Sequence, residues 1–178
     1  KFLDLNRVQV DTNRLIKFYK NRGFYNVKIK STTAVITQEN QFELIFNINA
    51  GNKFTFGKIK FENKNSNLIE DLTIFDKEFK NLEGENYSKI KLNNLIDDIN
   101  EFTLNNDFVF LNANFKEIKK DDNTIDIIIN LDDLDKKFVE RINILGNFIT
   151  DEKVIRNSLI IDEGDPFNEI LFNKSISN

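Results

Sequence analysis

The chain has 178 residues, a net charge of −4, 40% hydrophobic residues and 30% charged residues, which is ordinary for a globular protein. It contains neither Cys nor His, so disulfides, zinc sites with Cys or His ligands, cysteine nucleophiles and histidine acid–base chemistry are excluded. Its Lys and Arg residues are scattered, which argues against a nucleic-acid partner, and no apolar run is long enough to predict a membrane span. Because the sequence starts at Lys1 and has no Met, we expect a fragment or a processed product.

The first fifty residues predict a helix followed by a hairpin. Apolar positions from Leu5 to Tyr19 recur at helical spacing, and Arg22-Gly23 ends the pattern, since Gly readily takes the left-handed conformation after a helix. Alternating strands are predicted over 24–36 and 42–49. Together these elements predict one helix packed on two antiparallel strands.

The middle of the chain predicts a complete unit of strand, two helices and two strands. Its elements, in chain order, are a strand at 54–61, a polar turn at 63–67, a helix at 68–79 ended by Glu83-Gly84, a helix capped by Ser88, a strand at 108–115, a turn at 121–123 and a strand at 124–131. The remaining residues predict a strand at 138–145, a turn at Gly146-Asn147, a helix at 150–161 and a second helix starting near Asn168.

The same pattern recurs about every 80 residues. Residues 5–29 align with 89–113 at an offset of 84. At an offset of 83, the strand residues Ile59 and Phe61 align with Ile142 and Ile144, and at an offset of 80, Glu83-Gly84 aligns with Glu163-Gly164. We therefore predict an α+β fold of tandem βααββ units, each a three-stranded mixed sheet with two helices on one face. The expected divisions are 1–51, the end of one unit; 52–135, a complete unit; and 136–178, the start of another.

Three motifs carry a resemblance to a known family: "LIKFYKNRGFYNVKI" (15–29), "FVERINILGN" (138–147) and "VIRNSLIIDEGDPFN" (154–168). With the βααββ repeat, they resemble the POTRA domains of the BamA family of outer-membrane assembly proteins, within the Omp85 superfamily. The resemblance implies that the chain holds the end of the third domain, the whole fourth and the start of the fifth. The middle unit departs from the pattern, because Asn106-Asp107 stands where Arg-Gly is expected, so either Asp or Asn takes the left-handed conformation there or the helix ends with a different cap.

No catalytic, cofactor-binding or metal-binding residues are predicted, and we expect a protein that is not an enzyme. "GNKFTFGKI" (51–59) resembles a phosphate-binding loop, but Ile59 follows its Lys and the segment leads into a strand instead of a helix. "NLDDLDKK" (130–137) lacks the glycine and the closing Glu of a calcium-binding loop, which favours a solvated acidic turn.

The resemblance implies a periplasmic arm tethered to the outer membrane through the protein's own C-terminal β-barrel. Its partners would be unfolded outer-membrane proteins and accessory assembly lipoproteins. The alternatives are the arm of another Omp85-type system, in two-partner secretion or organelle import, or a structural spacer.

The second strand of each unit is the predicted contact surface, because an edge strand has unpaired N–H and C=O groups that an extended peptide can pair with. The predicted protein-binding residues are Tyr25, Asn26, Val27, Lys28, Ile29, Phe108, Val109, Leu111, Ala113 and Phe115.

Overall fold

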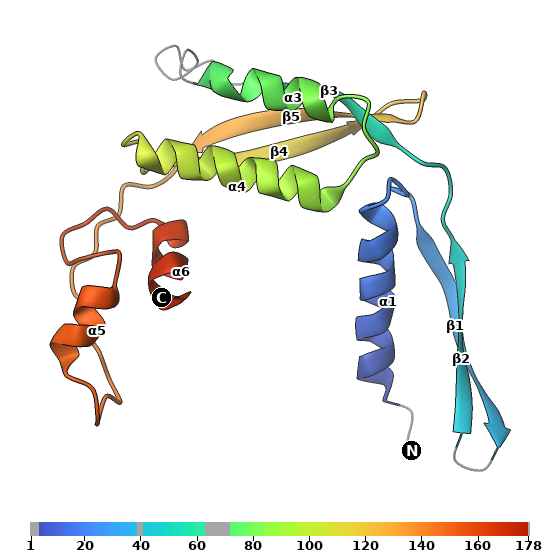
Figure 1. The fold of residues 1–178 in the computed structure, drawn as a ribbon, viewed down its shortest axis with the longest axis horizontal. Helices are drawn as coiled ribbons and strands as arrows, with labels where there is room; N and C mark the ends of the chain where they lie inside the picture. Colours follow the sequence, from blue (N-terminus) through green and yellow to red (C-terminus); the bar gives the residue numbers. More distant parts are fainter. Residues whose placement is uncertain (1–3, 39–40, 63–71, 178) are drawn as a thin grey trace. The chain divides into compact units, whose positions relative to one another are not determined.

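The computed structural model of the protein describes residues 4–38, 41–62 and 72–177 (Figure 1). The chain divides into two compact units, one made of residues 1–98 and 114–130 and the other of residues 99–113 and 131–178.

The first helix, α1, spans Leu5–Lys20 and begins where the sequence predicted. The Asp4 carboxylate caps it by accepting a hydrogen bond from the backbone N–H of Asn6 at 3.0 Å. The helix ends in a turn in which Gly23 has a φ of +92°, a conformation that favours glycine. The predicted helix and its glycine stop are therefore confirmed.

The hairpin that follows is shorter at its start than predicted. Strands β1 (Lys28–Gln38) and β2 (Gln41–Asn49) form a two-stranded antiparallel sheet. The predicted strand at 24–36 begins only at Lys28, because the N–H of Val27 bonds back to the carbonyl of Phe24 at 3.2 Å and closes a turn. The predicted alternation still holds in burial, since Val27 is buried while Asn26 and Lys28 are exposed.

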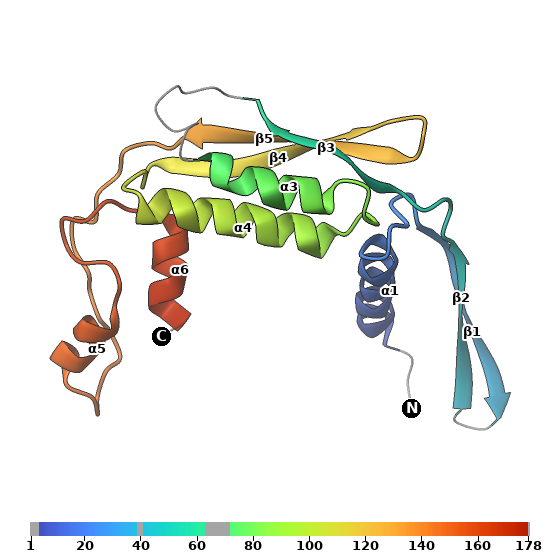
Figure 2. The ribbon, with the colours of Figure 1, turned by 45° about the horizontal axis from the view of Figure 1, so that its top comes forward.

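The complete βααββ unit is present as predicted. Its elements are β3 (Thr55–Phe61), the 3₁₀ turn η1 (Thr73–Phe75), α3 (Asp76–Leu82), α4 (Lys89–Asn105), β4 (Leu111–Lys119) and β5 (Thr124–Asp133). The sheet has the order β3-β5-β4, with β3 parallel to the central β5 and β4 joined to β5 by a short turn, so the sheet is mixed. Figures 1 and 2 show α3 and α4 on the same face of this sheet. The predicted turn at 63–67 and the predicted start of the first helix at Leu68 lie outside the described residues.

The core of this unit lies between the sheet and the two helices. The central strand alternates between half-buried and buried positions along most of its length, and Ile125, Ile127 and Ile129 are completely buried. Leu92 and Ile99 from α4 are also inaccessible to solvent. The turns follow the predicted chemistry, since Asp107 after α4 has a φ of +66° and Asn123 between β4 and β5 has a φ of +62°.

The last part of the chain differs from the prediction. Residues 138–145 do not form the expected strand, and their one β-bridge in the described chain pairs Phe138 with Pro166. A strand needs a hydrogen-bonded neighbour; β3 has β5, but the described residues give 138–145 no equivalent of β5.

The two helices of this part are present. Helix α5 (Glu152–Ser158) is shorter than the predicted 150–161, because Leu159 is already extended. Helix α6 (Glu169–Ser177) starts where predicted, and the Asn168 side chain accepts a hydrogen bond from the N–H of Ile170 at 2.8 Å.

Candidate functional site: the strand edges and the Glu117 cluster

Only part of the first predicted binding segment lies in a strand. Lys28 and Ile29 begin β1, whereas Tyr25 and Asn26 lie in the preceding turn. Val27 is buried, and its N–H is engaged by Phe24. The segment 25–29 therefore combines a turn, in which Val27 is buried and Asn26 exposed, with the first two residues of a strand.

The second predicted segment runs into a true sheet edge. Leu111, Ala113 and Phe115 lie in β4, which pairs with β5 on one side and is the outer strand on the other. Phe108 and Val109 precede the strand, and the carbonyl of Val109 accepts a hydrogen bond from the side chain of Asn168 at 2.9 Å.

An asparagine from α4 bonds to the backbone of this edge. The N–H of Ala113 donates to Oδ1 of Asn100 at 2.6 Å, and Nδ2 of Asn100 donates to the carbonyl of Ala113 at 3.5 Å. Both residues are buried, with exposed fractions of 6% for Asn100 and 3% for Ala113. Asn100 was not among the predicted residues, although a polar residue among the apolar positions of a helix stripe is a visible signal.

A second polar site, which we call the Glu117 cluster, consists of Tyr25, Tyr87, Lys89 and Glu117. The hydroxyls of Tyr25 and Tyr87 donate to the Glu117 carboxylate at 2.8 Å and 2.6 Å, and Nζ of Lys89 donates to it at 2.8 Å. The rings of Tyr25 and Tyr87 also meet edge to face, 5.2 Å apart. The cluster ties the turn after α1 to the start of α4 and to β4.

The electrostatics of the cluster favour a charged carboxylate and neutral phenols. Burial alone would raise the pKa of Glu117, but the hydrogen bonds from Lys89, Tyr87 and Tyr25 outweigh it and lower that pKa. Burial, together with the hydrogen bond to Glu117 and its charge, raises the pKa of Tyr25 to about 12 and also raises the pKa of Tyr87. At neutral pH the phenols therefore remain donors, and the arrangement holds the chain together instead of moving protons.

Backbone contacts accompany the cluster. The N–H of Phe54 donates to the carbonyl of Gly23 at 2.7 Å, and the N–H of Ile90 donates to the side chain of Asn21 at 3.1 Å. A Cβ on Gly23 would lie 3.0 Å from the Phe54 carbonyl oxygen, so this close approach requires glycine. The "NRG" of the first motif is thus explained by an inter-segment contact.

A set of backbone hydrogen bonds occurs twice in the chain, in the register that the repeat predicts. In the first set, the N–H groups of Phe56, Gly84 and Tyr87 donate to the carbonyls of Glu85, Phe56 and Phe54, respectively. In the second set, the N–H groups of Val139, Gly164 and Phe167 donate to the carbonyls of Asp165, Val139 and Lys137. A carboxylate also recurs, because Glu83 accepts from the N–H of Ile59 at 3.1 Å and Glu163 accepts from the N–H of Ile142 at 3.0 Å. The offsets of 83 and 80 therefore align equivalent structural positions.

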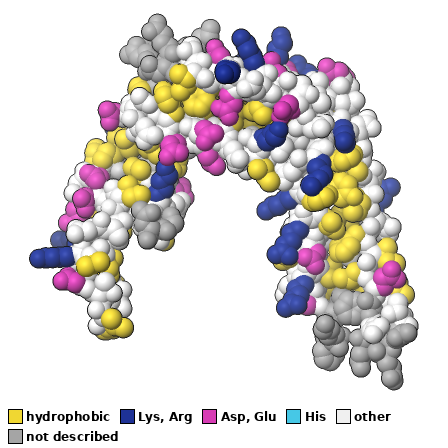
Figure 3. All heavy atoms as spheres, in the orientation of Figure 1, with side chains coloured by type: hydrophobic (Ala, Val, Ile, Leu, Met, Phe, Trp, Pro, Cys, Tyr) yellow, Lys and Arg dark blue, Asp and Glu magenta, His cyan; other side chains and the backbone are white. Residues whose placement is uncertain are grey.

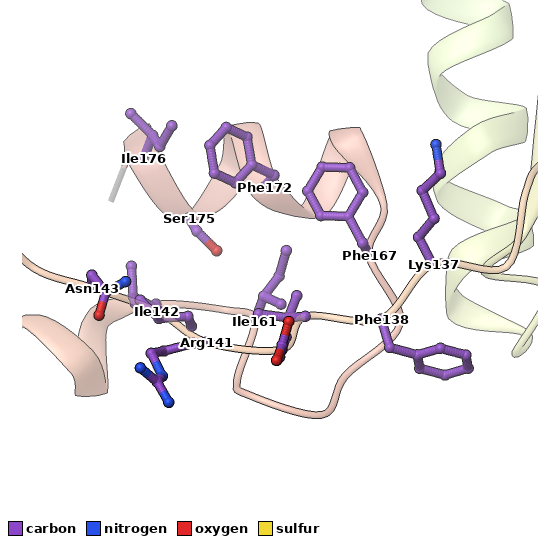
Figure 4. Close-up of a pocket in the computed structure, with 13 residues that line it drawn as sticks. Lys137, Phe138, Arg141, Ile142, Asn143, Ile161, Phe167, Phe172, Ser175 and Ile176 are labelled. Carbon is purple, nitrogen blue, oxygen red and sulfur yellow. The ribbon is translucent and has the colours of Figure 1, made fainter.

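The second compact unit contains an apolar pocket of about 630 Å³. Figure 4 shows Phe167, Phe172 and Ile176 on one side of it and Ile142 and Ile161 opposite. Figure 3 shows hydrophobic side chains at the surface in the part of the chain that holds α5 and α6, together with charges of both signs. Within the described ranges, no helix is long and apolar enough to cross a membrane, and acidic residues form no group of three or more that is suited to a metal ion.

Comparison with known proteins agrees with this geometry. Residues 1–51 match the sequence profile of the POTRA family, described as a surface antigen variable number repeat. The crystal structure of Haemophilus influenzae BamA POTRA3-5 is similar with a TM-score of 0.71 and 15% identity, over 94% of this chain and 66% of that one. The crystal structure of BamA from Haemophilus ducreyi lacking POTRA domains 1-3 is similar with a TM-score of 0.52 and 15% identity, over 75% of this chain and 24% of that one. Among curated proteins, no sequence matches significantly.

The fold is therefore that of tandem βααββ domains. Residues 1–51 match the POTRA family model, and the chain has the fold of BamA POTRA domains, which agrees with the resemblance read from the sequence motifs. At 15% identity the structural similarity shows the fold, and the chain spans 66% and 24% of the two solved structures.

Proposed function

We propose that the chain is part of a non-enzymatic periplasmic arm of an Omp85-type protein, and specifically of an outer-membrane β-barrel assembly protein. In this role it binds unfolded outer-membrane proteins and accessory lipoproteins and passes clients to the protein's own C-terminal β-barrel. The observation that carries the proposal is the BamA POTRA fold, in which β1 and β4 each pair with a single neighbouring strand in the described sheets.

Clients are proposed to bind as an added strand. The outer side of an edge strand offers backbone donors and acceptors that pair with any extended peptide, so recognition depends little on client sequence. Lys28 and Lys30 are exposed at the start of β1, which favours client strands that carry Asp or Glu beside it.

The proposed binding is weak. Four or five backbone hydrogen bonds at about 0.5–1.5 kcal/mol each must offset the ordering of the client strand. The expected dissociation constant is about 0.1–1 mM, which corresponds to roughly 4–5.5 kcal/mol. Such contacts release a client readily, as transfer toward a barrel requires.

We further propose that the chain consists of one complete POTRA domain, residues 52–135, between the end of one domain, residues 1–51, and the start of another, residues 136–178. The repeated hydrogen bonds around Gly84 and Gly164 support this division, because each marks the same place in successive repeats. By this alignment β1 and β2 are the second and third strands of the first domain.

A peptide titration tests the proposed function. The ¹⁵N-labelled chain is titrated to about 1 mM, the weak end of the expected affinity range, with an extended peptide in which apolar residues alternate, as in outer-membrane strands. The control peptide has the same composition, with its apolar residues rearranged to helical spacing. We expect amide shifts in β1 or β4 with the first peptide only; no response, or an equal response to both peptides, contradicts the proposal.

The Glu117 cluster favours a second candidate, a structural spacer. Its charge-assisted bonds join segments 92 residues apart in the sequence, as a stiff connection between domains requires. A spacer would give no peptide response in the same titration.

A further inference from the structure

The two edge strands predicted to bind clients are not equivalent. We infer that Asn100 closes the β4 edge to added strands at Ala113, and that β1, which lacks such a residue, is the open edge. This inference rests on the proposed function and deepens it by assigning which edge receives the client.

The Asn100 side chain occupies both backbone groups that an added strand would use. In an antiparallel pair, the N–H and C=O of one residue point to the same side of the strand. Both groups of Ala113 go to Asn100, so they face away from β5, and residues two positions away face the same outer side. The N–H of Leu111 is also engaged, by the carbonyl of Phe108 at 3.1 Å. The outer edge of β4 is thus occupied over its first three residues.

Displacing the Asn100 side chain is costly because it is buried. Its amide would lose two hydrogen bonds and remain away from water, with an exposed fraction of 6%. An added strand gains only two hydrogen bonds at Ala113 in exchange. The net gain at this position is therefore close to zero, while the cost of ordering the peptide remains.

The first repeat has the same backbone register but a different side chain. Two turn bonds recur at the offset of 84: Phe24 N–H to Tyr19 and Val27 N–H to Phe24 correspond to Phe108 N–H to Thr103 and Leu111 N–H to Phe108. In this register Ile16 takes the place of Asn100, and Ile29 takes the place of Ala113. An isoleucine side chain has no polar atom, so Ile16 cannot engage the backbone of Ile29. Among the described residues, the edge of β1 therefore lacks the closure that β4 has.

The occupant we infer for β1 is an extended segment of an unfolded polypeptide with acidic residues. The exposed Lys28 and Lys30 provide the charge complementarity for acidic residues. In β4, the negative charge of Glu117 lies between Lys116 and Lys119 and offsets their positive charge. A suitable probe is a free peptide with the sequence of β5, residues 124–133, which has four isoleucines and one leucine and carries three aspartates.

Two exchanges between the repeats test the inference. Asn100→Ile gives β4 the residue of the first repeat, and Ile16→Asn gives the first repeat the residue of α4. Ile16 lies in α1, which has no buried residue, so the second variant is expected to fold even if the first is destabilised. Each ¹⁵N-labelled 178-residue protein is titrated with the β5 peptide, and amide hydrogen exchange is measured without peptide.

In the unsubstituted protein we expect the peptide to shift β1 amides and leave Ala113 unchanged. Asn100→Ile is expected to speed exchange of the Ala113 amide about tenfold, which is the loss of one hydrogen bond of about 1.4 kcal/mol, and to add peptide shifts at Ala113 and Phe115. Ile16→Asn is expected to reduce the shifts in β1.

The failures are distinguishable. Three results overturn this inference alone. In the unsubstituted protein, these are peptide shifts at Ala113 as large as those in β1, or shifts confined to β2. The third is a folded Asn100→Ile variant that shows no new shifts in β4. A peptide that shifts no edge in any of the three proteins overturns the proposed function and, with it, this inference.

Discussion

Replacing Glu117 with Gln tests whether the Glu117 cluster stabilises the chain through its charge. The substitution keeps the size of the side chain, which is 16% exposed, but removes the carboxylate charge, so the two bonds from Tyr25 and Tyr87 become neutral while Lys89 remains a charged donor. Hydrogen bonds to charged groups contribute about 1.5–3 kcal/mol and neutral ones about 0.5–1.5 kcal/mol, so each bond loses about 1 kcal/mol. Because Lys89 is 41% exposed, its bond is screened by water and counts for less. We expect Glu117→Gln to lower the free energy of unfolding by about 2 kcal/mol at pH 7.

This loss depends on pH with a defined sign. The pKa of Glu117 is lower in the folded protein than its ordinary value of 4.5, so its charge stabilises the fold above that value. As the pH falls below 4.5 and through the folded-state pKa, the carboxylate is protonated and comes to resemble Gln. In the unfolded chain the pKa of Glu is about 4.3. The difference in the free energy of unfolding between the unsubstituted protein and Glu117→Gln is therefore expected to be largest above pH 5 and to shrink toward pH 3.

Urea unfolding followed by tyrosine fluorescence measures this difference, because two of the three tyrosines lie in the cluster. Glu85→Gln is the matched control: Glu85 pairs with Lys91 in the same unit, but its side chain is 47% exposed, and we expect a change within about 0.5 kcal/mol. A loss below about 0.5 kcal/mol for Glu117→Gln, or a loss of the same size from pH 3 to pH 7, would refute the reasoning.

Two further predictions concern the turn and the core, and urea unfolding checks both. Gly23→Ala should destabilise the protein more than Gly84→Ala: both glycines have positive φ, worth about 1–2 kcal/mol, but only at Gly23 would the new Cβ meet a carbonyl oxygen at 3.0 Å. Equal losses would show that the contact with Phe54 adds nothing. Ile127→Ala should cost about 2–5 kcal/mol because Ile127 is completely buried, whereas Ile36→Ala, at an 83% exposed position, should change stability by less than about 0.5 kcal/mol. Similar losses at the two isoleucines would contradict the described core.

Local chemistry explains why the element order was predictable. Gly23 and Gly84 end helices with positive φ, and Asp107 does the same where the family pattern has glycine. The strand pattern of Ile125, Ile127 and Ile129 has a period of two residues and is buried accordingly. Each of these features depends on a few neighbouring residues, so the sequence alone displays it.

The polar sites were not predictable because their partners lie far apart in the sequence. Tyr25 and Glu117 are 92 residues apart, and nothing in either segment alone pairs them. Signals were nevertheless present: Glu117 lies two residues after Phe115 and so on the same side of β4, and Asn100 interrupts an apolar helix stripe. Buried polar residues of this kind must find partners, so they indicate tertiary contacts without specifying them.

The failed strand prediction at 138–145 separates local structure from sheet formation. The backbone bonds of Val139 and Gly164 repeat those of Phe56 and Gly84, so this part of the repeat forms without a sheet. The apolar side chains of this part are nevertheless not buried as they are in the complete unit.

Equivalent positions in α4 and α6 show how much the burial of apolar side chains differs. Leu92 and Ile96 are 0% and 7% exposed, whereas the corresponding Phe172 and Ile176 are 45% and 68% exposed. In the complete βααββ unit these helix positions belong to a core that includes Ile127 of β5, and among the described residues no such strand packs on α6. The pocket beside α6 is lined by Phe172 and Ile176 themselves, so in this chain the sheet, not the turn chemistry, decides whether an apolar helix stripe is buried.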